Sequence, residues 1–396
     1  MKKSIINSIF LSAVFACLVG FSSCHDDIYG AINNEIELNS SGLQGDMHSI
    51  VHYKNYILTC NGDIFYKTNE PSTTKGKYRQ WEKTTSPTSE KGDNGIPATT
   101  YFLATDSEYL YALTYIWVEN DDGENEPKTA TIYATNSDPA NGLVWTKVAN
   151  ISGGNYSFEN AKVIFDNKYF YVDDNNSVSI ANREAYARIR ATSGNAYKLY
   201  KLNGSNAPEE VSNPTFVGES DSTNAISACY FNSNTYFSRY YGMTSNANCL
   251  YYTKTYTRSN NVSTNSSLYY ITASDATEHS VDLDAGGLLS IAAAKDYILL
   301  GTSSGLSRVK INETTGIPDG DTSSMESNGN SVISEYVFMV FVLNPNKREG
   351  SNDTTGTDEY AASTIYGSIR SSSDSWDDAG LYAWYPAKNE WNRDGD

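Results

Sequence analysis

After its first two dozen residues, the 396-residue sequence holds no long apolar run, which excludes a protein that crosses the membrane repeatedly with helices. Histidine is scarce, at four residues, and no Cys-x-x-Cys pair occurs, so a structural zinc site and His-based chemistry are disfavoured. Basic residues are also few, because 29 Lys and Arg stand against 47 Asp and Glu. The resulting net charge of −18 repels phosphate backbones and argues against nucleic-acid binding.

The one long apolar stretch lies at the N-terminus, where Lys2 and Lys3 precede an apolar segment over residues 5–20. This pattern predicts a secretory signal over residues 1–23. Phe21, two serines and Cys24 follow, and this end of the signal resembles the lipobox of bacterial lipoproteins, with Phe21 in place of the more usual Leu. The resemblance implies cleavage before Cys24 and acylation of Cys24. The alternative is an ordinary secretory signal with an incidental cysteine.

The segment over residues 24–45 is expected to form an acidic tether. His25-Asp26-Asp27, directly after Cys24, resembles the export signal with which some Gram-negative anaerobes bring lipoproteins to the outer surface. That resemblance implies an outer-membrane lipoprotein exposed at the cell surface, with the membrane reached only through the lipid anchor. A solvated tether that faces the periplasm is the alternative.

Three cysteines remain beyond the anchor: Cys60, Cys229 and Cys249. An odd number in an oxidising compartment leaves at least one thiol unpaired. Cys229 and Cys249 fall on expected nearby strands, so they either form a disulfide or are two small buried apolar side chains.

The rest of the chain is rich in Tyr, Thr, Val, Ile and Phe in short runs between Asn, Gly, Ser and Asp clusters, which predicts an all-β protein. A motif of a polar turn, a strand with Tyr or Thr, and a second aromatic strand recurs, and flanking strands make four per unit. Tandem four-stranded units are typical of a β-propeller. We expect residues 46–396 to form one propeller of six blades, or of seven if a long unit hides a degenerate one, against the alternatives of a β-sandwich pair or a β-solenoid. The motif recurs near Tyr56, Tyr109, Tyr169, Thr235, Tyr297 and Thr364.

Residues 135–145 resemble the Asp-box turn of sialidase-like propellers, in which an Asp caps a tight hairpin and a Trp packs behind it. The spacing is stretched and one copy is recognisable, so the resemblance bears on fold and not on activity. Overall the chain resembles uncharacterised β-propeller lipoproteins on the surface of glycan-foraging, gut-anaerobe-type Gram-negative bacteria. This resemblance carries no motif for a reaction.

The longest inserts, at 117–128, 173–196, 241–267 and 370–380, fall largely between second and third strands and should meet on one face of the ring. Several long loops on one face favour that face as the binding surface. Exposed aromatic rings stack on sugars or anchor protein partners, although the tryptophans could instead hold their own loops in place. The candidate ligand-binding residues are Trp117, Arg183, Tyr186, Arg188, Tyr240, Tyr241 and Trp376.

Two acidic clusters, residues 121–124 and Asp374 with Asp377 and Asp378, offer oxygen ligands for Ca²⁺. Neither matches the EF-hand pattern, and a solvated acidic loop explains both. No cofactor and no metal site is therefore expected.

We favour a non-catalytic surface protein that binds a glycan or a surface or matrix protein, and no catalytic residue is assigned. A glycoside hydrolase or lyase is the first alternative, but it needs two facing carboxylates, and the many Asp and Glu single out no pair. A sialidase-like site would need several converging Arg, whereas Arg183, Arg188 and Arg190 crowd one insert. A scaffold subunit of a surface assembly is the second alternative.

Overall fold

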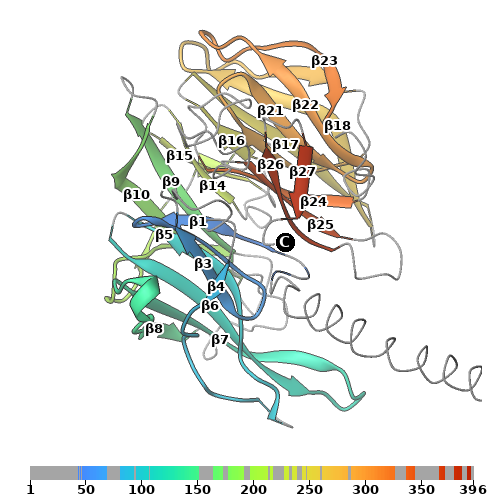
Figure 1. The fold of residues 1–396 in the computed structure, drawn as a ribbon. Helices are drawn as coiled ribbons and strands as arrows, with labels where there is room; N and C mark the ends of the chain where they lie inside the picture. The colour runs from blue at the N-terminus through green and yellow to red at the C-terminus, as the bar shows by residue number, and fades with distance from the viewer. Residues whose placement is uncertain are drawn as a thin grey trace, which may run out of the picture. The chain divides into compact units, whose positions relative to one another are not determined.

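The structure is a computed structural model, and the residues that it describes lie within the unit Leu43–Gly395 (Figure 1). Residues 1–42 and 394–396 lie outside the described residues, and with them the signal, Cys24 and most of the expected tether. Within the unit, the description leaves out 44, 46, 69–80, 93–94, 107, 151–163, 173–176, 191–196, 213–214, 217–226, 232–233, 239–242, 247, 259–260, 284–286, 326–335, 344–364, 371–378 and 386–389.

The described residues form seven antiparallel sheets that follow one another along the chain, with a parallel pair in the fourth. The first three are β1 (Ile50–Tyr53), β2 (Tyr56–Cys60), β3 (Ile64–Thr68), β4 (Glu82–Lys83); β5 (Thr99–Thr105), β6 (Leu110–Glu119), β7 (Asn125–Thr135), β8 (Thr146–Asn150); and β9 (Ile164–Val172), β10 (Ser177–Arg190), β11 (Tyr197–Lys201), β12 (Glu209–Glu210). The fourth holds β13 (Thr215–Phe216), β14 (Ser227–Phe231) and β15 (Asn234–Ser238).

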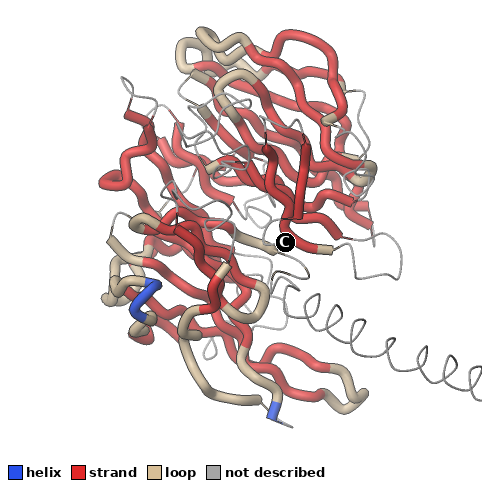
Figure 2. Tube along the Cα trace, in the orientation of Figure 1, coloured by secondary structure: helices blue, strands red, loops and turns tan. Residues whose placement is uncertain are grey.

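The last three sheets are β16 (Met243–Ser245), β17 (Cys249–Arg258), β18 (Asn261–Thr272), β19 (His279–Asp282); β20 (Leu288–Ala293), β21 (Tyr297–Thr302), β22 (Gly305–Ile311), β23 (Pro318–Ser324); and β24 (Tyr336–Val342), β25 (Ile365–Arg370), β26 (Gly380–Tyr385), β27 (Glu390–Arg393). Strands and loops account for nearly all of the described chain (Figure 2), and the helix among its named elements is one 3₁₀ turn, η3 (Pro139–Asn141).

Neighbouring sheets pack face against face, and the last sheet packs against the first. One apolar cluster joins the first sheet to the second, another the second to the third, and two more join the fifth, sixth and seventh. Strand β14 lies between β9 and β16, which links the third, fourth and fifth sheets. A further cluster joins Ile57 and Phe65 of the first sheet to Leu381 and Ala383 of the last. This closed sequence of sheets is a β-propeller, and the predicted all-β propeller is confirmed.

The sheets depart from the expected units in two places. The structure has six four-stranded sheets and one three-stranded sheet among its described residues, because the unit expected near Thr235 is divided between the fourth and fifth sheets. The insert expected as a loop at 173–196 contains the strand β10, and Tyr169 lies in the first strand of its sheet, not the second. Both errors arise because pairing with neighbouring strands, and not local composition alone, decides which residues form a strand and in which sheet.

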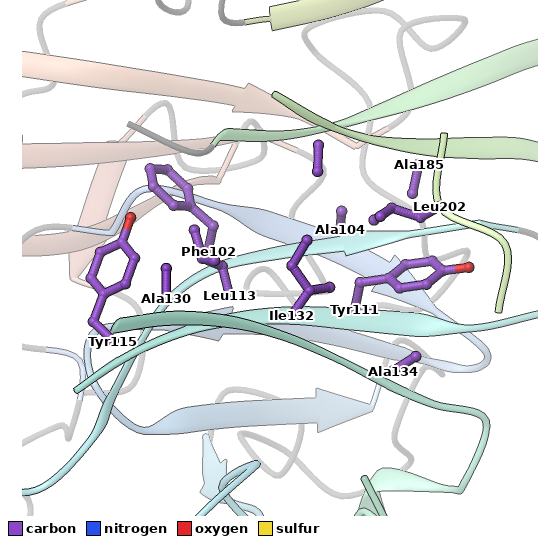
Figure 3. Packing of buried hydrophobic residues seen from close by; sticks show 11 residues of the cluster. Phe102, Ala104, Tyr111, Leu113, Tyr115, Ala130, Ile132, Ala134, Ala185 and Leu202 are labelled. Atoms are coloured by element: carbon purple, nitrogen blue, oxygen red, sulfur yellow. The ribbon is translucent and has the colours of Figure 1, made fainter. Parts of the chain in front are cut away.

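The middle strands are buried on both faces. In β6, Leu110 and Ala112 face the first sheet, while Tyr111 and Leu113 face the third. Figure 3 shows the second of these layers, in which the β6 side chains meet Ala185 and others of the third sheet. A strand covered on both sides reads as a continuous apolar run without alternation, which is the pattern that the recurring motif carries.

The contact between first and last sheets is completed by the segment that precedes β1. Leu43 and Met47 are fully buried in the cluster between the two sheets. The backbone N–H of Met47 donates to Ser368 Oγ of β25 at 3.0 Å. Lys67 is only 4% exposed, and its ammonium lies over the Trp81 and Tyr366 rings at 4.8 and 5.1 Å. Apolar burial and these polar contacts together hold the first and last sheets in one ring.

A tyrosine clasp links the second sheet to the third. Asp106 Oδ1 accepts from the backbone N–H groups of Glu108 and Tyr109 at 2.7 and 2.6 Å, which forms the turn between β5 and β6. The Tyr111 hydroxyl donates to Asp106 Oδ2 and accepts from the Gly204 N–H, at 2.7 Å, in the turn after β11. Burial and the Asp106 carboxylate raise the pKa of Tyr111, so it remains a hydrogen-bond donor.

The same clasp links the fifth sheet to the sixth. Asn246 Oδ1 accepts from the N–H groups of Asn248 and Cys249, both at 2.9 Å, and its Nδ2 donates to the Tyr251 hydroxyl at 3.0 Å. Tyr251 in turn donates to the Gly316 carbonyl at 2.6 Å in the turn after β22. The recurrence shows that an Asx turn followed by a buried tyrosine is one of the devices that join successive sheets.

Met47→Ala should lower the free energy of unfolding by about 2–5 kcal/mol, because it leaves a cavity between the first and last sheets. Val144→Ala, at a side chain that is 76% exposed, should stay within about 0.5 kcal/mol of the parent. Denaturant unfolding measures both. Equal, small losses of stability in the two variants would contradict a role of the Met47 side chain in closing the ring.

Gly204→Ala should destabilise the fold more than Gly95→Ala. Both glycines have positive φ, 58° and 75°, where an alanine costs about 1–2 kcal/mol. A Cβ at Gly204 would also lie 2.8 Å from the Tyr109 ring, whereas one at Gly95 meets nothing within 4 Å. The difference in Tm between the two variants measures the close contact of residue 204 with the Tyr109 ring. Equal shifts in Tm would argue against that contact.

Candidate functional site

A long hairpin marks one end of the second sheet. The first residue of β5, Thr99, pairs with Tyr115 of β6, so the rest of the β6–β7 hairpin extends beyond the start of β5 (Figure 1). Its turn is held by Asn120 Oδ1, which accepts from the N–H groups of Asp122 and Glu124 at 3.1 and 2.9 Å. Because neighbouring strands are antiparallel, this hairpin lies at the end of the ring where the first strands begin.

Three first strands carry a β-bulge near this same end. The pairing register shifts between Thr100 and Phe102 in β5, between Leu288 and Ser290 in β20, and between Val337 and Met339 in β24. The residue left over in each strand is large and apolar or aromatic. We call these three residues, with His48 just before β1, the axial collar: His48, Tyr101, Leu289 and Phe338.

His48 contacts two of the other three collar residues. Its ring stacks on Tyr101 of the second sheet, with centroids 4.3 Å apart and planes 24° apart. It also meets the edge of Phe338 in the last sheet at 5.3 Å and the ring of Phe102 at 5.4 Å. Collar residues from the last and second sheets therefore meet at the segment that leads into the first, where the ring closes.

The aromatic contacts continue outward along the hairpin. Tyr101 stacks on Tyr115 at 5.3 Å, and Tyr115 meets Trp117 edge to face at 6.0 Å. Trp117 Nε1 donates to Thr99 Oγ1 at 2.5 Å. We call His48, Tyr101, Tyr115 and Trp117 the aromatic row; Tyr115 is buried, and the other three side chains are half-buried, with Tyr101 and Trp117 packed against the apolar cluster between the second and third sheets.

The backbone under Trp117 is fixed by the loop before β5. Gly92 approaches it so closely that an ideal Cβ there would lie 1.6 Å from the Trp117 carbonyl oxygen. The Gly92 N–H donates to the Ile96 carbonyl at 2.8 Å, which closes a small loop beside the hairpin. The position therefore requires glycine, and the loop limits movement at the base of the hairpin.

The structure places Trp117 and Tyr186 in strands, where loops were expected. Trp117 belongs to the aromatic row, and its contacts also hold the base of its own hairpin. Tyr186, in β10, is 7% exposed and its hydroxyl donates to Glu184 at 2.6 Å, with Lys201 at 2.8 Å from the same carboxylate. A side chain so buried and so paired is part of the core and not an exposed binding ring.

The side chains of the other five candidates lie outside the described part of the structure. Arg183 and Arg188 lie on the strand β10, and their side chains are outside the described part of the structure. Tyr240, Tyr241 and Trp376 are outside the described residues altogether.

His48 and Tyr101 were not among the predicted site residues, because one lies just before a strand and the other within one, and neither lies in a long insert. One signal in the sequence points to His48. His48-Ser49-Ile50 precedes a Tyr-Ile-Leu strand at the same distance as Leu289-Ser290-Ile291 does, so alignment of the repeats places His48 and Leu289 at one structural position.

The acidic segment at 121–124 is an exposed hairpin turn whose backbone is held by Asn120. Within the part of the chain that the structure describes, no group of three or more His, Cys, Asp or Glu side chains could hold a metal ion. Asp374, Asp377 and Asp378 lie outside that part.

The turn over residues 135–145 has two features of the Asp-box that it resembles. Asp138 Oδ1 accepts from the Ala140 N–H at 2.9 Å and so caps η3, and Gly142 follows with φ 83°. Trp145 packs against the cluster between the first two sheets, and its Nε1 donates to the Thr85 carbonyl at 2.9 Å. These contacts shape the turn between β7 and β8, away from the aromatic row.

A Gly-x-Ser-x-Gly pentapeptide occurs at Gly301–Gly305, a pattern that in α/β-hydrolases forms a strand–turn–helix elbow around the nucleophile. Here it forms the hairpin turn between β21 and β22, and the Ser303 N–H donates to the Gly287 carbonyl at 3.0 Å. The elbow geometry that activates such a serine is therefore not formed at this pentapeptide.

Two buried cysteines are free thiols. Cys249 Sγ donates to the Thr315 carbonyl at 3.3 Å, so the disulfide with Cys229 that the sequence left open is not formed. Burial raises the pKa of Cys60 to about 12 and that of Cys249 to about 11. Neither is a reactive nucleophile at neutral pH.

No protein-family model matches the sequence, and no curated protein matches it. Solved structures that resemble the fold include the PQQ-bound aldose sugar dehydrogenase from Streptomyces coelicolor, at 9% identity and TM-score 0.42 over 86% of this chain and 94% of that one. A putative glucose dehydrogenase from a Thermus species has 9% identity and TM-score 0.41 over 90% and 96% of the two chains. The Dos1 propeller has 8% identity and TM-score 0.36 over 90% and 85%. Such distant likenesses assign no activity to this chain.

In the described part of the chain, no helix has the length and apolar character needed to cross a membrane.

Cys60 and Cys249 should resist thiol reagents at pH 8 in the folded protein, because both stay protonated and buried at that pH. In a Cys24→Ser, Cys229→Ser background without the signal, a colorimetric thiol titration should give no fast phase before denaturant is added and two thiols after. Rapid labelling of the native protein would contradict the burial of these residues.

Proposed function

We propose that this chain is a lipoprotein, anchored through Cys24 at the outer-membrane surface, that binds a glycan without cleaving it. The observation that carries the proposal is the aromatic row, which runs from the collar to the long hairpin on the face where the first strands begin. The signal and the lipobox-like end of the N-terminal segment support the location.

The chemistry of the row suits a sugar. Trp117 offers apolar ring area to the C–H face of a pyranose, since Tyr101 is already stacked on His48 and Tyr115, and the polar atoms of Tyr, Trp and His can meet its hydroxyl groups. The rings of His48, Tyr101 and Tyr115 stack on one another, so binding orders few side chains. A rigid, half-exposed row therefore suits a ligand that is rich in hydroxyl groups and also has apolar faces.

Trp117→Ala should lower the affinity for a glycan bound by the parent by about tenfold, or about 1.4 kcal/mol. The binding is found by a glycan array, using the chain from residue 24 with Cys24→Ser, and measured by calorimetry. Trp145→Ala is the matched control, because Trp145 is also half-exposed but lies at the opposite end of the sheet.

Three outcomes would count against the proposal. An array without any hit, together with capture of a surface protein, would favour a scaffold. Release of new reducing ends from a bound glycan would favour a hydrolase. Equal losses of affinity in Trp117→Ala and Trp145→Ala would show that the glycan does not bind at the aromatic row.

A further inference from the structure

We propose that the axial collar is a sugar subsite of its own, specific for an uncharged pyranose unit, and that the aromatic row joins it to Trp117 on a single glycan chain. This inference rests on the proposed function and deepens it. The ligand class that follows is a neutral oligosaccharide of several units.

The three β-bulges recur at matching places in their sheets, which supports a binding site formed by the fold itself. A bulge leaves one residue out of the pairing and turns its side chain, and bulges are common beside functional sites. Here the displaced residues are Tyr101, Leu289 and Phe338, at matching places in three sheets. One bulge could be local irregularity, but repetition with a bulky side chain each time directs apolar groups to the same end of the ring.

The collar is also pre-organised. His48 is held between Tyr101 and Phe338, and the backbone on either side of it is fixed. Before it, the Met47 N–H donates to Ser368 Oγ; after it, the Ser49 carbonyl accepts from Thr59 Oγ1 at 2.8 Å. A ring fixed by both backbone neighbours keeps its position without a ligand, which lowers the entropy lost on binding.

The composition of the collar indicates which sugars fit. Phe338 is buried and Leu289 is half-exposed, so they supply apolar surface, while Tyr101 and His48 add half-exposed rings with polar atoms. The chain carries a net charge of −18, which opposes the approach of uronates and sialosides. Neutral pyranoses combine apolar faces with hydroxyl groups and carry no such penalty.

The contacts also connect the collar to the hairpin. Tyr101 stacks on the buried Tyr115, which meets Trp117, so one buried ring connects Tyr101 of the collar to Trp117 of the hairpin. A glycan long enough to reach both ends gains from the second contact through effective concentration. Affinity should therefore rise with chain length.

The test is calorimetry of the mature chain with Cys24→Ser, titrated with neutral β-linked glucose, mannose and xylose oligomers from disaccharide to hexasaccharide. For the sugar that binds, the hexasaccharide should bind at least about tenfold more tightly than the disaccharide. Tyr101→Ala should remove most of that gain, and Tyr101→Phe should keep much of it. Tyr297→Ala is the matched control, because Tyr297 is half-exposed at the turn between β20 and β21, the opposite end of the ring.

Unchanged melting curves and near-ultraviolet circular dichroism show that Tyr101→Ala still folds; if it does not, Tyr101→Phe and His48→Ala carry the test. If glycan binding depends on Trp117 but Tyr101→Ala or His48→Ala behaves like Tyr297→Ala, the axial subsite is wrong and the proposed function stands. If uronic-acid oligomers of equal length bind as tightly as neutral ones, the ligand class is wrong. If no glycan binds at all, both proposals fall.

Discussion

Burial of every sheet against two neighbours is the constraint on which this structure depends. A middle strand such as β6 or β2 is apolar on both faces, so a sheet left at the end of an open row would expose a full apolar face to water. The first and last sheets remove that exposure by packing on each other, with Leu43 and Met47 filling the contact. Ring closure then brings the starting ends of the first strands together, and the collar exists only because of it.

The polar contacts between sheets add direction to this burial. Apolar packing alone would tolerate sliding of one sheet over the next, whereas the Tyr111 and Tyr251 hydroxyls each bind one backbone group of the following sheet. Both tyrosines are buried, so an unmet hydroxyl would be costly and only one register satisfies it. The clasps therefore fix the register of the second sheet against the third and of the fifth against the sixth.

What the sequence could predict follows from how local each feature is. The Tyr-Ile-Leu strands and their polar turns are local patterns, and they predicted the propeller and most second and third strands. The strand β10 was expected as a loop, since its charged residues obscure a pattern that only pairing with β9 and β11 reveals. The bulges at Tyr101 and Phe338 are invisible in the same way, because a register shift is a property of two strands.

The site shows the same division between local and distant information. Trp117 was predicted as an aromatic residue in a long insert. The contact of His48 with Phe338 arises where the first and last sheets meet, as does the hydrogen bond between Met47 and Ser368, 321 positions apart. A row placed on strands and at the ring closure keeps its geometry better than one placed on loops, because each ring is held by strand pairing and by its neighbours. Substitutions in the surrounding loops would then leave the geometry of the row in place.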